Sequence, residues 1–162
     1  MSTQPIRVQV ISISDTRTEH DDLSGAKLVE LLGGIDADVH DKMIVSDDLG
    51  ELTAALFAHS QRDDVDLIIT TGGTGLSRRD NTPEATRAVI DREAPGIAEA
   101  MRRETSKNTP FAMLSRGVCG SRGRVLIVNL PGSPKAVAEC FEVIKPMLRH
   151  AVDQLKGSAK HD

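Results

Sequence analysis

The sequence is poor in aromatic residues, with no tryptophan, no tyrosine and three phenylalanines among 162 residues. Proteins that bind single-stranded nucleic acid stack bases on aromatic rings, and nucleic-acid-binding proteins in general carry an excess of positive charge. The formal net charge of this chain is −4. Both features argue against a nucleic-acid partner, so we expect any bound nucleotide to be a small molecule.

Cysteines and long apolar stretches are also scarce. Cys119 and Cys140 are the two cysteines, and the absence of a CxxC motif gives no support to a zinc site or a disulfide framework. We expect both thiols in or near the core. The opening residues MSTQPIRVQV lack the basic and long apolar regions of a signal peptide, and no apolar stretch approaches the roughly 20 residues that cross a bilayer. We therefore expect a soluble cytoplasmic protein with no membrane partner.

Strand-like apolar segments alternate along the chain with segments of helical periodicity, which is the pattern of an α/β sheet with helices on its faces. The length and the 39% hydrophobic content fit a single domain, expected over residues 1–157, followed by a polar and frayed tail over residues 158–162. Strands are expected at 6–13, 39–45, 65–71 and 124–130, and helices at 23–34, at 46–60 and after Thr82, Pro95 and Ser133.

The ends of these helices have recognisable signals. Ser24 and Ser46 are the expected N-caps of the first two helices, because a serine hydroxyl can accept an unpaired N–H of the first turn. Pro146 is expected to bend or interrupt the last helix, since proline lacks the N–H that the helix needs. Gly157 is expected to end it.

Two loops each follow an apolar strand and precede a helix, the place where open α/β sheets bind ligands. They are TGGTGLSRRDNTP, residues 71–83, and PGSPK, residues 131–135. The first contains neither GxxxxGK[ST] nor GxGxxG, which excludes a P-loop and a dinucleotide fingerprint. Its glycines let backbone N–H groups approach an anion, and its arginines can neutralise phosphate charge. Its aspartate would be costly in a pure anion site, which favours a role in holding magnesium or orienting a ligand hydroxyl.

The residues of these loops, and Asp47 and Ser115 outside them, also have structural interpretations. The glycine-rich loop can be a tight turn alone, and Asp47 can simply occupy the first turn of the helix that Ser46 caps. Asp80 can form an ion pair with Arg78 or Arg79 or make a contact at the N-terminus of the next helix, and Ser115 beside an arginine is more often structural than functional. The Pro-Gly pair at residues 131–132 would be a turn in most proteins.

Three segments together carry a family resemblance: SISDTRTEHDDLSG, TTGGTGLSRRDNTPEAT and TPFAMLSRGVCGSRGRVLIVNLPGSPKAVAEC. From about Ile6 to Gly157 the chain resembles the molybdopterin adenylyltransferases, that is, the Mog/MoaB family and the related domain of gephyrin. The resemblance implies a three-layer α/β/α sandwich with a mostly parallel sheet, assembled as a homotrimer. It also implies that AMP is transferred from ATP to the terminal phosphate of molybdopterin, with magnesium present and pyrophosphate released. A molybdenum insertase that consumes the product is the implied partner.

The resemblance also assigns roles to individual residues. The two essential aspartates, implied as catalytic residues and magnesium ligands, match Asp47 and Asp80. The implied nucleotide-binding residues are Gly72, Gly73, Thr74, Gly75, Arg78 and Arg79. The implied molybdopterin-binding residues are Ser14, Asp15, Ser115, Arg116, Asn129, Pro131, Gly132 and Ser133. The sequence departs from the family pattern at Asn81, where valine is usual, and we expect local effects from this.

The proposed chemistry fits these residue types. A phosphate monoester is already largely ionised at neutral pH, so adenylyl transfer to it needs cations and aimed N–H groups more than a base, and neither loop contains a histidine. Two other hypotheses remain: a non-catalytic molybdopterin-binding or scaffold protein of the same fold, and a regulatory nucleotide binder. A pure scaffold does not need both Asp47 and Asp80, which favours the enzyme.

Overall fold

The computed structural model describes residues 4–158, so the tail expected over residues 158–162 lies, beyond its first residue, outside the described part. Six strands form one sheet in the order β2-β1-β3-β6-β5-β4. Their bounds are β1 Ile6–Ile13, β2 Ala37–Val45, β3 Leu67–Thr71, β4 Arg92–Glu93, β5 Cys119–Arg122 and β6 Val125–Leu130. The helices are α1 Leu23–Leu32, α2 Leu49–Ser60, α3 Thr82–Val89, α4 Pro95–Thr105, α5 Pro134–Leu155 and the 3₁₀ helix η1 Pro110–Leu114.

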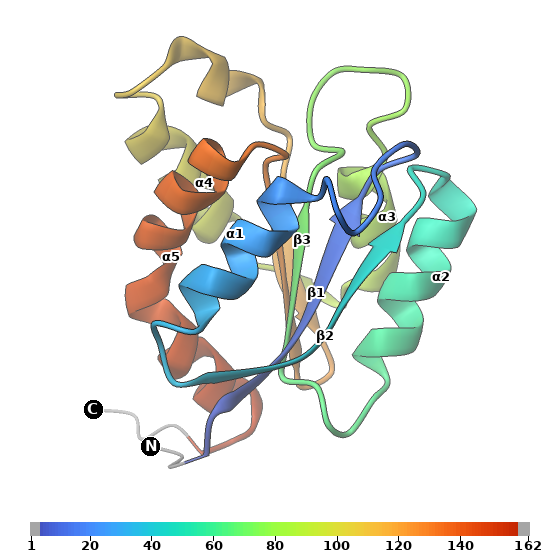
Figure 1. Ribbon diagram of the computed structural model, residues 1–162. Helices are drawn as coiled ribbons and strands as arrows, with labels where there is room; N and C mark the ends of the chain where they lie inside the picture. The colour runs from blue at the N-terminus through green and yellow to red at the C-terminus, as the bar shows by residue number, and fades with distance from the viewer. Residues whose placement is uncertain (1–3, 159–162) are drawn as a thin grey trace.

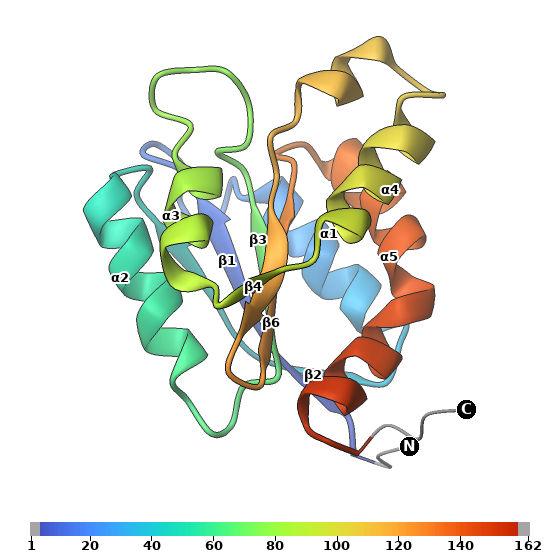
Figure 2. The same ribbon diagram turned by 180° about the vertical axis from the view of Figure 1, so that it is seen from behind.

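The sheet is mostly parallel and lies between two layers of helices. β2, β1, β3 and β6 pair in parallel, whereas β5 is antiparallel to β6 and β4 is antiparallel to β5. Helices α1, α4 and α5 cover one face of the sheet, and α2 and α3 cover the other (Figures 1 and 2). This arrangement confirms the expected three-layer α/β/α architecture. The antiparallel edge formed by β4 and β5 was not expected.

Two apolar clusters lie on the two faces of the sheet. Because side chains alternate along a strand, Val8 and Val10 of β1 enter the cluster under α1, α4 and α5, and Ile11 and Ile13 enter the cluster under α2 and α3. Burial on both faces explains why β3 and β6 are continuous apolar runs. Both cysteines are buried as expected, and burial raises the pKa of Cys119 to about 12 and that of Cys140 to about 11.

Both serine caps expected for the first two helices are wrong. The N-cap of α1 is Asp22, whose carboxylate accepts the N–H of Gly25 at 3.1 Å. The N-cap of α2 is Asp48, which accepts the N–H of Glu51 at 3.0 Å. In each case an aspartate two residues from the expected serine occupies the position from which a side chain reaches the first free N–H groups. Both helices therefore begin beside an acidic residue.

The last helix begins and ends as expected. The hydroxyl of Ser133 accepts the N–H of Ala136 at 3.2 Å, and Gly157 ends the helix with a φ of +73°, in the left-handed region that favours glycine. The expected interruption at Pro146 is absent, because α5 continues through it to Leu155. Burial of one helix face against the sheet offsets the single hydrogen bond that proline removes. Among the helices of residues 4–158, none combines the length and the apolar character needed to cross a bilayer.

Candidate active site

The expected site residues lie at one edge of the sheet, in the loops that follow the carboxyl ends of the parallel strands. Asp15 follows β1, Asp47 follows β2, the segment 72–81 follows β3 and the segment 131–133 follows β6. All these loops gather at the upper end of the molecule in Figures 1 and 2. Parallel strands place their carboxyl ends at the same edge, which is why loops distant in sequence meet here.

The glycine-rich loop begins with two glycines whose conformations demand glycine. Gly72 has a φ of +100° and Gly73 a φ of +68°. A Cβ on Gly72 would lie 2.7 Å from the carbonyl oxygen of Ile13, and one on Gly73 would lie 2.3 Å from the hydroxyl oxygen of Thr82. The Thr82 hydroxyl in turn donates to the Gly72 carbonyl at 2.9 Å. The loop therefore packs against both the end of β1 and the start of α3.

Asp15 and Arg79 form the main ion pair of the site. Two guanidinium nitrogens of Arg79 donate to the Asp15 carboxylate, each at 2.8 Å. The carboxylate also accepts the Ser46 hydroxyl at 2.9 Å and the Asp47 N–H at 3.1 Å. The hydrogen bonds from Arg79, then that from Ser46, lower the pKa of Asp15. The structure thus places Asp15 beside the glycine-rich loop and Asp47, and Ser46 serves this cluster instead of capping α2.

Asp47 is half-buried and lacks a cationic side chain bonded to it within residues 4–158. Burial, followed by the negative charge of Asp15 and that of Asp80, raises the pKa of Asp47. One carboxylate oxygen lies 3.3 Å from the position that a Cβ on Gly73 would take. Asp47 precedes the N-cap of α2 and therefore lies outside its first turn. The site holds this carboxylate against the glycine-rich loop in an environment short of positive charge.

Asp80 closes the glycine-rich loop from the other side. Its carboxylate accepts the N–H of Ser77 at 2.9 Å and lies 2.9 Å from the position that a Cβ on Gly75 would take. Within residues 4–158 it forms no ion pair with Arg78 or Arg79, because Arg79 binds Asp15 and the side chain of Arg78 has no bonded partner there. Within these residues Asp80 therefore does not form the ion pair with a neighbouring arginine that is its structural alternative. No three His, Cys, Asp or Glu side chains form a metal-binding group in that part of the chain.

A cavity of about 320 Å³ adjoins this loop, between α4, η1 and the start of α5. Apolar side chains from α4 and η1, including Met101 and Phe111, form much of its wall. Of the expected molybdopterin-binding residues, Ser115, Asn129, Pro131 and Ser133 line it, together with Thr74 and Gly75 of the loop. Ser14, Asp15, Arg116 and Gly132 do not line it. The structure therefore brings half of that expected set together around one cavity.

The polar residues of the cavity differ in how many hydrogen bonds they already form within the chain. The Asn129 amide donates to the hydroxyls of Thr70 and Thr86 at 3.0 Å each, and its oxygen accepts the Val118 N–H at 3.0 Å. Ser133 caps α5. Ser115 accepts one N–H, from Gly117 at 3.3 Å, which leaves its O–H available as a donor. Ser115 thus keeps an O–H donor for a ligand, as does Ser133, which accepts only the Ala136 N–H at 3.2 Å.

Two arginines that sequence reasoning missed support the cavity and its neighbouring turn. Arg102 of α4 lines the cavity and donates to the carbonyls of Ser115 at 3.3 Å and Gly117 at 3.1 Å. Arg17 donates to the carbonyl of Gly132 at 3.3 Å, from the loop after β1. Arg17 lies within the first of the three motif segments but was given no role there, and Arg102 lies outside all three, so only the folded contacts reveal what these arginines do.

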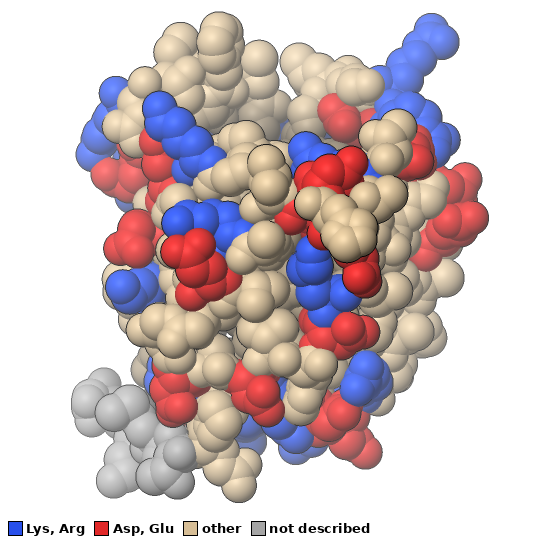
Figure 3. All heavy atoms as spheres, in the orientation of Figure 1, with Lys and Arg blue, Asp and Glu red and all other residues tan. Residues whose placement is uncertain are grey.

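The surface around the site is divided in character. Lys and Arg side chains project at the upper right of Figure 3, with Asp and Glu side chains beside them, whereas the top of the lobe at the upper left is uncharged. Phe111, Met113 and Leu114 of η1 are exposed in this lobe. Leu76 of the glycine-rich loop is also exposed. The arginines of the charged side suit an anionic ligand, and the apolar side suits an aromatic one.

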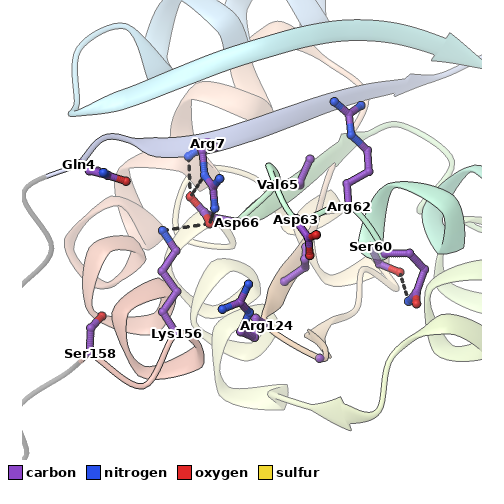
Figure 4. A pocket seen from close by; sticks show the side chains of 13 residues that line it. Gln4, Arg7, Ser60, Arg62, Asp63, Val65, Asp66, Arg124, Lys156 and Ser158 are labelled. Carbon is purple, nitrogen blue, oxygen red and sulfur yellow. Dashed lines mark hydrogen bonds and ion pairs between the residues drawn. The ribbon is translucent and has the colours of Figure 1, made fainter.

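A second, wider cavity of about 570 Å³ lies at the opposite end of the sheet (Figure 4). Its wall contains Arg7, Lys156 and the buried Asp66, and none of the expected site residues lines it. Asp66 accepts the Arg7 guanidinium at 2.7 and 3.0 Å and lies 3.0 Å from the Lys156 ammonium. The charges of Arg7, Lys156 and Asp66 largely neutralise one another, unlike the charges at the edge of the sheet where the carboxyl ends of the parallel strands meet.

A protein-family model described as "Probable molybdopterin binding domain" matches residues 9–150, a range that contains both site loops. The chain belongs to this molybdopterin-binding family. Family membership confirms the resemblance carried by the three sequence motifs, and the fold agrees with that of other members.

Individual relatives in the molybdopterin-binding family match along most of the chain. A molybdopterin adenylyltransferase from Helicobacter pylori strain J99 is 38% identical over 160 residues, which cover 96% of this chain and 90% of the relative. The molybdenum cofactor synthesis protein cinnamon from Drosophila melanogaster is 42% identical over 92% of this chain, which spans only 25% of that longer protein. The crystal structure of the molybdopterin biosynthesis enzyme MoaB from Thermus thermophilus has a TM-score of 0.87 at 44% identity, covering 95% of this chain and 98% of that one.

Proposed function

We propose that the chain is a molybdopterin adenylyltransferase, which transfers AMP from ATP to the terminal phosphate of molybdopterin in molybdenum cofactor biosynthesis. The main support is that Thr74 and Gly75 line the apolar cavity, while Gly73 of the same loop adjoins Asp47. One loop is therefore shared by a carboxylate-lined compartment and by a cavity able to take an aromatic ring. A transferase that joins a nucleotide to a pterin needs two such compartments side by side.

Roles for the residues follow from this arrangement. The N–H groups of residues 72–75 would meet the phosphates of ATP, and Arg78, whose side chain has no bonded partner within residues 4–158, would add a positive charge. Arg79 completes the nucleotide side and reaches phosphate by leaving Asp15. The cavity residues Ser115, Pro131 and Ser133 would contact molybdopterin. Asn129 lines the cavity with its amide already bonded to Thr70 and Thr86, so it would shape the wall. Gly132, Ser14 and Asp15 do not line the cavity and would support the neighbouring loops.

The residues present fit a magnesium ion. Asp47 and Asp80 supply the hard oxygen ligands that magnesium prefers, and the repulsion that Asp47 experiences from Asp15 and Asp80 calls for a cation. Magnesium commonly uses one or two protein carboxylates and takes its other ligands from phosphates and water, so a larger cluster is not required. When bound, it would neutralise negative charge on the reacting phosphates. The chain itself then orients the nucleophilic phosphate and the N–H donors, and no general base is needed.

The decisive experiment mixes the chain with molybdopterin, ATP and magnesium and follows adenylylated molybdopterin and pyrophosphate by mass spectrometry and a coupled assay. We expect both products in equal amounts. Binding of molybdopterin without ATP binding would support the scaffold hypothesis instead. ATP binding without transfer, and without molybdopterin binding, would support the regulatory nucleotide binder.

We also propose that residues 1–157 act as one domain, that the chain forms a homotrimer in the cytoplasm, where ATP is available, and that a molybdenum insertase receives its product. The family resemblance supports the trimer, and the exposed Phe111 and Met113 offer apolar surface for contacts between proteins. Light scattering should give three times the chain mass of 17.4 kDa. Concentration must come from refractive index, because tryptophan and tyrosine are absent. A monomer mass at micromolar concentration would contradict the trimer.

A further inference from the structure

We infer that Arg116 is a positioning residue that clamps the glycine-rich loop for the nucleotide, an inference that rests on the proposed function. The family resemblance assigns Arg116 to molybdopterin, next to Ser115. Ser115 lines the 320 Å³ cavity, but Arg116 does not. Its guanidinium lies instead against the loop that follows β3.

Arg116 joins the two arms of that loop. Its Nε donates to the carbonyl of Gly75 at 2.8 Å, on the outgoing arm, and its Nη2 donates to the carbonyl of Asp80 at 2.9 Å, on the returning arm. Its backbone N–H donates to the carbonyl of Thr74 at 2.8 Å. One rigid, planar group thus spans the neck of the loop at two carbonyls, and the backbone adds a third contact.

A carboxylate holds this guanidinium in place. The remaining bonded nitrogen, Nη1, pairs with Glu84 in the first turn of α3. The planar guanidinium directs its donors along fixed, separate directions, so one arginine can bind two carbonyls and a carboxylate together. Lysine, with a compact ammonium, cannot reproduce this geometry.

The clamp matters for the nucleotide because of what lies between the two bonded carbonyls. Residues 76–79 are exposed and include Arg78 and Arg79, and Asp80 itself forms one end of the clamp. A loop already held in its binding shape loses less conformational freedom when ATP binds. Loss of the clamp should therefore weaken ATP binding while leaving the cavity for molybdopterin intact.

The test compares Arg116→Ala, Arg116→Lys and the wild-type chain, with Arg87→Ala as a matched control. Arg87 lies on α3, as Glu84 does, and its substitution removes an exposed ion pair with Glu93 while leaving the hydrogen bonds of Arg116 in place. The first measurement needs no ligand: trypsin cleavage after Arg78 and Arg79 should accelerate at least about threefold in both Arg116 variants. The second is calorimetric titration with a non-hydrolysable ATP analogue plus magnesium and, separately, with molybdopterin.

Both Arg116 variants should bind the ATP analogue about tenfold more weakly, with molybdopterin affinity changed less than about twofold. Unchanged loop cleavage, or unchanged affinity for the analogue, would overturn the inference. So would a loss of molybdopterin affinity that equals or exceeds the loss for the analogue, because Arg116 would then belong to the pterin side. If the wild-type chain binds the analogue but transfers no AMP, the proposed function fails, and these binding and cleavage results still decide the role of Arg116.

Discussion

The amino end of the sheet holds a buried aspartate, Asp66, and the carboxyl end a half-buried one, Asp47, and their surroundings differ sharply. At the amino end, burial of Asp66 disfavours its charge, but hydrogen bonds from Arg7 and Lys156 outweigh burial and lower its pKa to about 2. At the carboxyl end, burial and two neighbouring carboxylates raise the pKa of Asp47. The same residue type is thus stabilised as an anion at one end and destabilised as an anion at the other.

This difference distinguishes a charge cluster matched within the chain from the cluster at the proposed active site. The Asp66 cluster joins β1, the start of β3 and the end of α5, and its charges are matched within the chain. The Asp47 cluster has more negative charge than its own cations neutralise, a state that folding alone does not favour. Unsatisfied charge next to a glycine-rich loop is what a site for a cation and phosphates requires. Substitution of Asp66 should therefore lower the stability and leave the activity unchanged. Substitution of Asp47 should lower the activity and leave the stability unchanged.

The largest expected effect is that of Gly73→Asp. An aspartate here must adopt a φ of +68°, its Cβ would lie 2.3 Å from the Thr82 hydroxyl, and its charge would face Asp47. Affinity for an ATP analogue should fall at least about a hundredfold, because strain and repulsion add to the loss of the anion site. Calorimetric titration measures this directly. Normal ATP binding would reduce the loop to a structural turn.

Gly123→Asp is the matched control at the amino end. Gly123 also has a positive φ, +54°, but a Cβ there would meet nothing within 4 Å. This variant should lose at least about 1 kcal/mol of stability from backbone strain and from repulsion by Asp91, whose carboxylate accepts the Gly123 N–H at 2.8 Å, and should bind the ATP analogue normally. A comparable loss of ATP binding in both variants would show that the effect at Gly73 is one of general destabilisation.

A second comparison sets one substitution at the amino end of the sheet against two substitutions at the proposed site. Asp66→Asn should lower the free energy of unfolding by about 2 kcal/mol and leave turnover unchanged, because it weakens charge-assisted hydrogen bonds far from the site. Asp47→Asn and Asp80→Asn should keep the stability and lower turnover at least about tenfold, which corresponds to about 1.4 kcal/mol. Urea unfolding followed by circular dichroism, alongside the adenylylation assay, gives both readouts. Full activity in either site variant would remove that residue from the mechanism.

The acid sensitivity of the amino end provides a third prediction. The pKa of Asp66 is lowered from 3.8 to about 2, so its stabilising contribution is present above the unfolded value and is lost as the pH falls through the folded value. The stability difference between wild type and Asp66→Asn, about 2 kcal/mol at neutral pH, should therefore shrink between about pH 5 and pH 2. Unfolding curves at one fixed protein concentration measure it. A difference that stays constant with pH would show that the Asp66 charge does not cause the stabilisation.

Sequence reasoning found the central strands because β1, β3 and β6 are apolar runs bounded by turn residues. It missed β4 and β5 because the two residues of one and the four of the other, CGSR, show no apolar alternation. The serine caps failed because an aspartate in the same turn competes for the same N–H groups. Local patterns contain no information on which of two nearby cap residues the folded turn selects.

The location of the site could be predicted from the sequence, because it depends on which loops follow the parallel strands. Asp47 and the loop around Gly73 follow strands of one sheet, so their proximity could be inferred from the strand pattern. The pairing of Arg79 with Asp15, 64 residues apart in sequence, could not, because many carboxylates are available to an exposed arginine. For the same reason the contacts of Arg116 with the loop appear only in the folded chain.

The smallest expected effect is that of Ser115→Ala, which tests the apolar side of the carboxyl edge alone. The substitution removes one hydroxyl whose oxygen accepts the Gly117 N–H at 3.3 Å, and Arg102 continues to hold the backbone of the segment through the Ser115 and Gly117 carbonyls. Because one hydrogen bond is lost, molybdopterin binding should weaken by about 0.5–1.5 kcal/mol, and the affinity for an ATP analogue should be unchanged. Titration of the variant with each ligand separates the two compartments. Equal weakening of both ligands would show that the cavity and the glycine-rich loop bind as a single unit, and no change in either would assign the Ser115 hydroxyl to the turn at Gly117.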